Sequence, residues 1–308
     1  MDKKFQILRY TEKYEKDITK LYFESYGRKK PQKYFRYRLK NNTFGTPIAY
    51  VMKFESQIVG FYALTPISLV INNVNYLGGY SFLTMTNKKF SGQGIFSKLA
   101  SKTFEKAKEK KYNFIVGFAN NNSFPLFIKK FKFTELKPIN YVKINLIQVI
   151  ENNNFKFTRN VLKNNNFFKL NSISKNNYSV YFAKNFKSLD KRINQHPLNK
   201  YYIYQNDTLL FIFKKYQNEL QILDFFSHNE IDLYSKLSLI ATNLSKKLKC
   251  DYVTLWIPKK HPLNKYVKST VNLASESHFI VKSFNSKIKN QICTINNWYY
   301  SMSDSDVF

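Results

Sequence analysis

The chain has 308 residues, of which 44% are hydrophobic and 18% aromatic, and this composition excludes a disordered or fibrous protein. Its two cysteines, Cys250 and Cys293, are too few for a disulfide framework or a zinc knuckle. No apolar run approaches the ~18 residues of a membrane-spanning helix, and the N-terminus has no apolar signal core, so we expect a cytoplasmic protein.

The net charge is +30, from 50 lysines and arginines against 20 acids. Such a charge often marks a protein that binds nucleic acid or anionic lipid. Here the lysines are scattered rather than gathered into a block, and they accompany abundant Asn, Ile, Phe and Tyr, as AT-rich codons would produce. The sequence therefore argues against nucleic acid as a partner, whereas a small anionic substrate, phosphorylated or nucleotide-linked, suits the charge.

The distribution of glycine divides the chain. All eight glycines lie within the first 117 residues. The backbone conformations and close approaches that glycine permits are therefore confined to the first half. A polar, Asn-rich stretch follows residue 150. We therefore predict a first domain over residues 1–150, a connection over residues 151–177 and a second domain over residues 178–308.

The first half alternates the patterns of strands and helices. Strands are predicted at residues 5–9, 48–54, 57–65, 80–86 and 113–117, and helices at residues 14–26, at 31–39, from 95 to beyond 107, and at 123–130. Tight reversals are expected at Glu55-Ser56 and at Asn72-Asn73. The helix that begins at Ile95 has the clearest pattern, because apolar residues occupy one face and lysines the other.

The second half follows the same order with different residues. Strands are predicted at residues 201–204, 208–213, 220–226 and 252–257, with a helix over residues 233–248 before the last of them. A sheet of hairpins that leads into a helix and a further strand, present twice, predicts a duplicated α+β unit.

The segment with the clearest chemistry joins the strand that ends at Thr86 to the helix that begins at Ile95. Gly92 and Gly94 allow the backbone to approach a ligand closely, and the first turn of the helix offers unpaired N–H groups to an anion. The segment lacks the third glycine of a dinucleotide-binding fold and the Gly-Lys-Ser/Thr of a P-loop. It predicts a site for a phosphate or pyrophosphate.

Ser91-Gly92-Gln93-Gly94-Ile95-Phe96 resembles the acyl-CoA-binding motif of the GNAT acyltransferase superfamily, Gln/Arg-x-x-Gly-x-Gly/Ala, with Ser91 and Phe96 departing from it. Downstream, Asn120–Ser123 resembles the family's Asn-x-x-Ser turn, and Phe131–Phe133 its closing Gly-Phe with Lys132 in place of glycine. The resemblance covers about residues 5–145. It implies an α+β GNAT fold with a mixed, mostly antiparallel sheet, and acyl-CoA bound by Thr86, Ser91, Gly92, Gln93, Gly94, Ile95 and Phe96.

The whole length resembles a narrower group, the two-domain sugar N-acyltransferases of surface-polysaccharide pathways, which acylate the amine of a dTDP-linked aminodeoxysugar. In that group the second half is a GNAT-like domain without the cofactor loop. The corresponding loop here, residues 227–230, contains no glycine. The resemblance thus implies one acyl-CoA, one nucleotide-linked aminosugar and no metal.

The implied reaction is the attack of a neutral amine on a thioester, which needs an oxyanion donor and a proton for the departing thiolate. The resemblance implies that the backbone N–H of Met85 is the donor. Many family members protonate the thiolate with a tyrosine, but Phe127 and Ile128 stand in that region here. Ser123, or a water held by Asn120, is the expected substitute, and helix capping is the alternative role for both residues.

Residues of the second half are predicted to bind the acceptor. Among the histidines, His261 follows a strand end and is retained as a substrate-binding candidate. The C-terminal tail carries Trp298 and Tyr299, whose rings are predicted to stack on a base or sugar, and Asp304 and Asp306, whose carboxylates are predicted to receive the amine. Alternatively, the tail is a last strand with both acids in solvent.

Two other functions remain open from the sequence. A transferase of the peptidoglycan-bridge type also pairs two GNAT-like halves, and its aminoacyl-tRNA donor would suit the basic charge. A non-catalytic binding module that kept the fold is the other alternative.

Overall fold

The computed structural model describes residues 5–40, 42–144, 155–159, 177–227, 233–265, 271–273 and 277–305. The chain forms two compact units. The first comprises Met1–Leu69, Asn75–Glu135 and Ser277–Cys293, and the second comprises Val70–Val74, Leu136–Glu276 and Thr294–Phe308. In the described part of the chain, no helix is both long and apolar enough to span a membrane.

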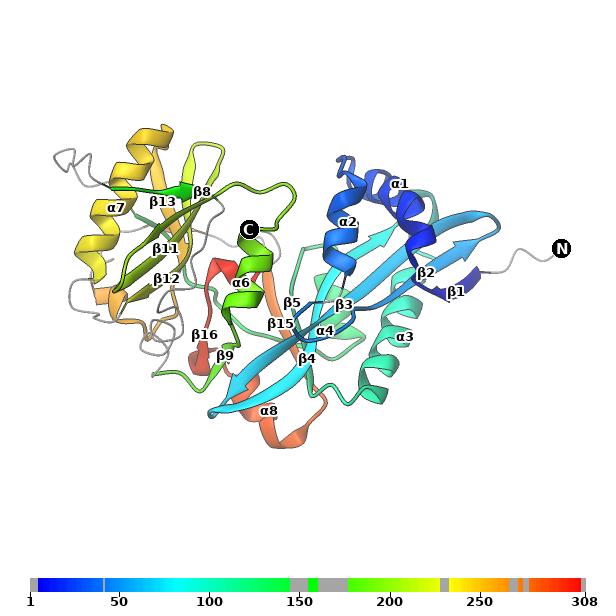
Figure 1. Ribbon diagram of the computed structural model, residues 1–308. Helices are drawn as coiled ribbons and strands as arrows, with labels where there is room; N and C mark the ends of the chain where they lie inside the picture. Colours follow the sequence, from blue (N-terminus) through cyan, green and yellow to red (C-terminus); the bar gives the residue numbers. More distant parts are fainter. Residues whose placement is uncertain are drawn as a thin grey trace. The chain divides into compact units, whose positions relative to one another are not determined.

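A mostly antiparallel sheet is the centre of the first unit (Figure 1). Its strands follow the order β1-β2-β3-β4-β5-β15-β6. Their bounds are β1 Phe5–Arg9, β2 Ile48–Phe54, β3 Gln57–Ile71, β4 Val74–Thr86, β5 Phe114–Ala119, β6 Thr134–Glu135 and β15 His278–Ser283. The helices are α1 Glu15–Tyr26, α2 Gln32–Leu39, α3 Ile95–Glu109, α4 Phe124–Lys129 and α8 Ser286–Ile292.

Local sequence explains the reversals between these strands. Glu55 joins β2 to β3 with a φ of 53°, and Asn72 and Asn73 join β3 to β4 with φ values of 49° and 64°. At Asn72-Asn73 both central residues of the two-residue turn have positive φ, a region that asparagine tolerates better than most residues. Both predicted reversals are confirmed.

Helix α3 covers the sheet and makes the crossover between two parallel strands, β4 and β5. Its apolar face, with Ile95, Leu99 and Phe104, belongs to the core of the first unit, while lysines occupy the exposed face. The predicted helix and its buried side are thus confirmed.

The pairing of β4 with β5 is short. It covers Gly79–Ser81 opposite Ile115–Gly117, and the remaining residues of the two strands, 82–86 and 118–119, are not paired with each other. Leu83 has a φ of 50° within β4, which interrupts the regular pleat of the strand where the pairing ends. The two strands therefore leave a backbone opening at their carboxyl ends.

The second unit repeats the arrangement. Its sheet has the order β14-β7-β13-β12-β11-β10-β8, with β7 Tyr141–Ile144, β8 Thr158–Arg159, β10 Tyr201–Gln205, β11 Leu209–Tyr216, β12 Glu219–Ser227, β13 Tyr252–Trp256 and β14 Val271–Leu273. Helix α7, Leu233–Leu248, joins the parallel strands β12 and β13. Apart from this sheet, the unit contains β9 Val180–Phe182, α6 Phe186–Ile193, β16 Trp298–Tyr299 and short 3₁₀ turns.

Each sheet contains one strand from a distant part of the sequence. Strand β15, near the C-terminus, lies between β5 and β6 of the first sheet, and β7, from the first half of the chain, lies between β13 and β14 of the second. The division therefore differs from the predicted domains, because residues 277–293 return to the first unit. Hydrogen bonds along the whole of β15 hold it there.

Most of the predicted connection, residues 151–177, and most of the glycine-free loop, residues 228–230, lie outside the described residues. The described Thr158 and Arg159 form β8, which pairs with β10. The predicted fold class is confirmed: both units are α+β, with mixed and mostly antiparallel sheets.

Candidate functional site

A pocket of about 530 Å³ in the first unit is lined by the carboxyl end of β4, the loop before α3 and the turn after β5. The end of α1 completes its wall. The lining residues are Ser25, Tyr26, Thr84, Thr86, Lys88, Phe90, Ser91, Gly92, Gly94, Ile95, Phe96, Ser97, Asn120, Asn122, Ser123 and Leu126.

The glycine loop presents its backbone to this pocket. Gly92 and Gly94 have φ values of 80° and 70°, and a Cβ added to either would meet no described atom within 4 Å. Gly94 is the N-cap of α3, and its carbonyl accepts from Lys98 N–H at 3.0 Å. The N–H groups of the first turn, which begins with Ile95, therefore precede the helical hydrogen-bond ladder. Together with the lining Lys88, they form a cationic cradle for an anion.

The turn after β5 is held by Asn120. Its Oδ1 accepts from the backbone N–H groups of Asn122, at 3.1 Å, and Ser123, at 3.0 Å, while its carbonyl accepts from Phe124 N–H at 2.9 Å. The Ser123 hydroxyl donates back to Asn120 Oδ1 at 3.2 Å. Asn120 and Ser123 thus build the entry to α4 and also line the pocket, so the geometry is compatible with both of their predicted roles.

The opened end of β4 is fastened to α1. The Tyr26 hydroxyl donates to the Thr84 carbonyl at 2.5 Å, and the Ser25 hydroxyl donates to the Thr86 carbonyl at 3.0 Å. The backbone N–H of Asn87 donates to the carbonyl of Val59, on β3, at 2.9 Å. Since backbone groups alternate along a strand, the amides of Thr84 and Thr86 face the edge toward α1, and the amide of Met85 faces the β3 edge.

Most of the predicted cofactor-binding residues meet in this one pocket: Thr86, Ser91, Gly92, Gly94, Ile95 and Phe96. Gln93 lies between the two glycines with an exposed side chain and is not among the lining residues. The side chain of Met85 is 1% exposed and is likewise not part of the described lining.

Sequence reasoning missed the contribution of α1. Ser25 and Tyr26 are separated from their β4 partners by 61 and 58 residues, so no local pattern indicates the contact. Lys88, Asn122 and Leu126 were also missed, although all three adjoin motifs already recognised. Their proximity to those motifs is the signal that would have identified them.

His261, predicted to bind substrate, is buried in the second unit with 2% of its surface exposed. Its Nδ1 accepts from Leu263 N–H at 3.2 Å, and its ring packs against Phe225 and Tyr299. Burial lowers the pKa of His261 to about 4. The ring is thus a neutral core group at neutral pH and presents no surface to a ligand in this structure.

The predicted tail residues are also in the interior of the second unit. Trp298 and Tyr299 are 0% and 2% exposed, and β16, which they form, pairs with β9. Neither ring is therefore available to stack on a base or sugar. This placement corrects the expectation that these aromatics face the acceptor, and its cause is the packing of an apolar segment into a core. Asp306 lies outside the described residues.

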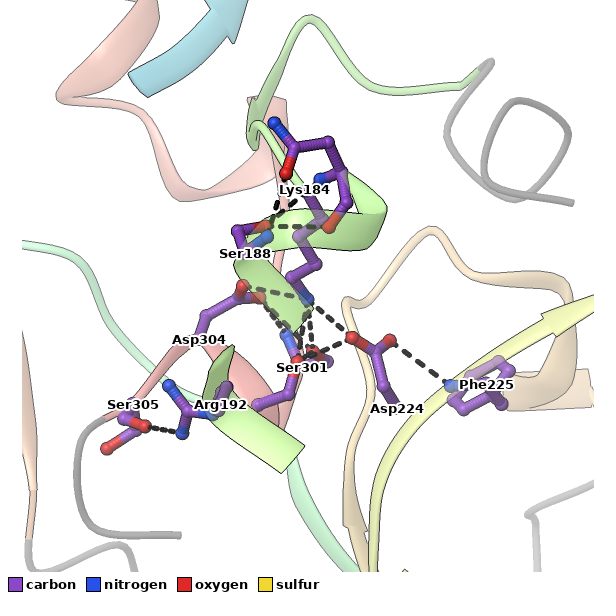
Figure 2. A network of polar contacts seen from close by, with 10 residues as sticks. Lys184, Ser188, Arg192, Asp224, Phe225, Ser301, Asp304 and Ser305 are labelled. Carbon is purple, nitrogen blue, oxygen red and sulfur yellow. Dashed lines mark hydrogen bonds and ion pairs between the residues drawn. The ribbon is translucent and has the colours of Figure 1, made fainter. Parts of the chain in front are cut away.

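Asp304 belongs to a buried network of polar contacts (Figure 2). The Lys184 ammonium lies 2.8 Å from Asp304 Oδ1 and 2.5 Å from Asp224 Oδ2, and it donates to the hydroxyls of Ser301 and Ser303. Asp304 is 7% exposed. Its carboxylate is therefore neither in solvent nor free to receive an amine, contrary to both readings of the sequence.

This network includes a residue of β12, whose parallel pairing with β13 corresponds in chain order to that of β4 with β5. The parallel pairing of β12 with β13 ends at Ile222 and Leu255, and Asp224 follows on β12. The Ser303 hydroxyl donates to Asp224 at 2.5 Å, so the C-terminal segment packs against β12 just beyond the end of this pairing. Among the described residues, no group of three or more metal-binding side chains is found.

Residues 6–133 match the family model described as "Acetyltransferase (GNAT) domain". No curated protein matches the sequence.

Several solved structures share the fold over most of this chain. A probable N-acyltransferase from Enterococcus faecalis has a TM-score of 0.69 at 13% identity, covering 92% of this chain and 73% of its own. The Saccharomyces cerevisiae N-myristoyltransferase with bound myristoyl-CoA has a TM-score of 0.61 at 11% identity, covering 91% and 79%.

A third similar structure is a GCN5-related glucosamine N-acetyltransferase region of a fungal β-N-acetylglucosaminidase. It has a TM-score of 0.58 at 12% identity, covering 91% of this chain and 38% of its own. The family match and these likenesses lead to one conclusion: the chain has the GNAT fold, and its residues 6–133 match the GNAT acetyltransferase domain model.

Proposed function

We propose that this protein is an N-acyltransferase that transfers an acyl group from acyl-CoA to a primary amine by direct attack on the thioester. The observation that carries the proposal is the pocket of the first unit, where the Gly92–Gly94 loop, the start of α3 and the opened end of β4 converge. The similar N-myristoyltransferase structure, which holds myristoyl-CoA, supports acyl-CoA as the ligand.

Each part of the pocket has a role in this proposal. The first-turn amides of α3, with Gly92, Gly94 and Lys88, bind the pyrophosphate. The opened end of β4 receives the pantetheine and the thioester, and a backbone N–H stabilises the oxyanion. Met85 remains the family-based proposal for this donor, and the amides of Thr84 and Thr86 are alternatives because they face the edge toward α1.

Proton transfer is assigned to groups on the pocket wall. Ser123, or a water held by Asn120, remains the proposed source of a proton for the thiolate, since both side chains line the pocket. Tyr26 is a further hydroxyl at the same wall. A thiol has an ordinary pKa of about 8.5, so the thiolate requires little assistance at neutral pH.

For the acceptor we propose a nucleotide-linked aminodeoxysugar, as in the dTDP-sugar N-acyltransferases that the whole sequence resembles. An anionic nucleotide suits the net charge of +30, and the similar fungal region described as a glucosamine N-acetyltransferase supports an aminosugar in general. The loop of the second half that corresponds to the glycine loop, residues 227–230, contains no glycine, which favours one acyl-CoA per chain.

The proposal is tested by the release of free thiol from acetyl-CoA and longer acyl-CoAs in the presence of dTDP-linked aminodeoxysugars. We expect thiol release that depends on the acceptor and an acylated sugar product by mass spectrometry. Free glucosamine and charged tRNA are the comparison substrates. Transfer from aminoacyl-tRNA without thiol release would favour the peptidoglycan-bridge type of transferase, and binding of CoA without turnover would favour a binding module.

A further inference from the structure

A histidine and a carboxylate from distant parts of the chain meet behind the Asn120 turn. His278 begins β15, where its register partner on β5 is Ala119. Its Nδ1 lies 2.8 Å from Glu135 Oε1, at the end of β6, and its Nε2 lies 2.9 Å from Asn121 Oδ1. The ring stacks on Phe124, the first residue of α4, with centroids 3.8 Å apart and planes 13° apart.

Both ring nitrogens of His278 thus have a partner. Two oxygen acceptors are satisfied together when both nitrogens carry a proton, or when the Asn121 amide turns its NH₂ group toward Nε2. Either arrangement gives two hydrogen bonds to one flat ring whose face is covered by Phe124. The ring is therefore fixed in position by three contacts from three different segments.

These contacts bear on the pocket through the turn. Asn121 lies between Asn120 and Asn122, which both line the pocket, and Phe124 follows Ser123, which lines it too. Glu135 and Ser277 are also the residues of the first unit on either side of the long segment Leu136–Glu276 of the second unit, so the Glu135–His278 pair joins the two strand ends that flank this segment.

We propose that His278, oriented by Glu135, is a positioning residue that holds the Asn120–Ser123 turn in the shape that binds acyl-CoA. This inference rests on the proposed function, because it assigns the pocket to acyl-CoA. It does not assign His278 a contact with the substrate. We expect the affinity of the folded protein for CoA to depend on the His278–Asn121 hydrogen bond.

The experiment measures the dissociation constant of CoA by calorimetry, together with the melting temperature of the unliganded protein. His278→Phe, which keeps a ring to stack on Phe124, and Asn121→Ala should each raise the dissociation constant about threefold to tenfold. The double variant should bind no more weakly than either single variant, because both remove the same contact.

His196→Phe is the matched control, since that histidine belongs to the second unit and its Nδ1 accepts hydrogen bonds from the nearby backbone of Leu198 and Asn199. It should leave CoA binding unchanged. If His278→Phe does not fold, Glu135→Gln, which keeps the shape of the side chain, provides the test. Unchanged dissociation constants in the folded variants would overturn the inference, whereas a wild type that binds no CoA would instead refute the proposed function.

Discussion

The Lys184 ammonium bridges the carboxylates of Asp304 and Asp224, which belong to the C-terminal segment and to strand β12. All three side chains are at most 8% exposed. Burial by itself would lower the pKa of Lys184, but the two carboxylates outweigh burial and raise it. Lys184 is therefore charged in the folded protein and fastens the tail to the second unit.

Replacing Lys184 by Met should destabilise the protein by about 3–5 kcal/mol, because the substitution leaves two buried carboxylates without their cation. The free energy of unfolding from urea titration measures the effect. Lys247→Met, an exposed position on α7, removes the same charge and should change the stability by less than about 0.5 kcal/mol. Equal effects of the two substitutions would show that the network contributes nothing specific.

Removal of residues 303–308 should lower the stability of the protein as well as its activity. The truncation takes away Ser303 and Asp304, two of the partners of Lys184, so the ammonium loses part of the compensation for its burial. Urea unfolding and the kinetics of the truncated protein are compared with those of the wild type. A truncation as stable as the wild type, with only the KM for the acceptor raised, would restore the idea of a tail that binds the acceptor directly.

His261 should make the protein sensitive to mild acid. Its folded pKa of about 4 lies below the ordinary value of about 6.5 for the unfolded chain. Between these values the unfolded state binds a proton that the folded state does not, so stability is fully present above pH 6.5 and is lost as the pH falls toward 4. The free energy of unfolding should therefore fall between pH 6.5 and 4 by up to about 3 kcal/mol less in His261→Gln than in the wild type. Parallel pH profiles for the variant and the wild type would contradict the burial argument.

Asn120 and Ser123 are predicted to matter for catalysis beyond their role in the turn. Asn120→Ala and Ser123→Ala should each lower kcat/KM at least about tenfold, which corresponds to about 1.4 kcal/mol of transition-state stabilisation. Steady-state kinetics and urea unfolding are measured on the same preparations. If activity falls only in proportion to a stability loss of about 0.5–2 kcal/mol, typical of a lost helix cap, the two residues are structural.

The sequence predicted the elements that short-range patterns determine. The apolar face of α3 repeats within a few residues, the turn at Asn72-Asn73 needs only residues that accept positive φ, and Gly92 and Gly94 are adjacent to the helix start that they serve. The principal lining of the candidate pocket was predictable for the same reason, because the motif contributes it almost continuously.

Contacts between distant segments were not predictable in this way. Strand β15 joins β5 across more than half of the chain, and a six-residue strand with three apolar residues at its centre fits either sheet equally well by pattern. The tail illustrates the same limit. Its acidic residues suggested that the tail lies at the protein surface. The burial of Asp304, however, depends on Lys184, 120 positions earlier in the sequence, and no local pattern indicates that partner.

The central claim is that one acyl-CoA binds at the Gly92–Gly94 loop. Calorimetric titration of CoA tests it directly, with the full-length wild type and the variants Gly94→Asp and Gly27→Asp. Both glycines have a φ near 70°, and an added Cβ at either meets open space, so the two substitutions impose similar backbone strain, while only Gly94 lines the pocket. We predict one CoA per chain, loss of binding in Gly94→Asp through repulsion of the pyrophosphate, and retained binding in Gly27→Asp. Unimpaired binding in Gly94→Asp, or a stoichiometry of two in the wild type, would contradict this account.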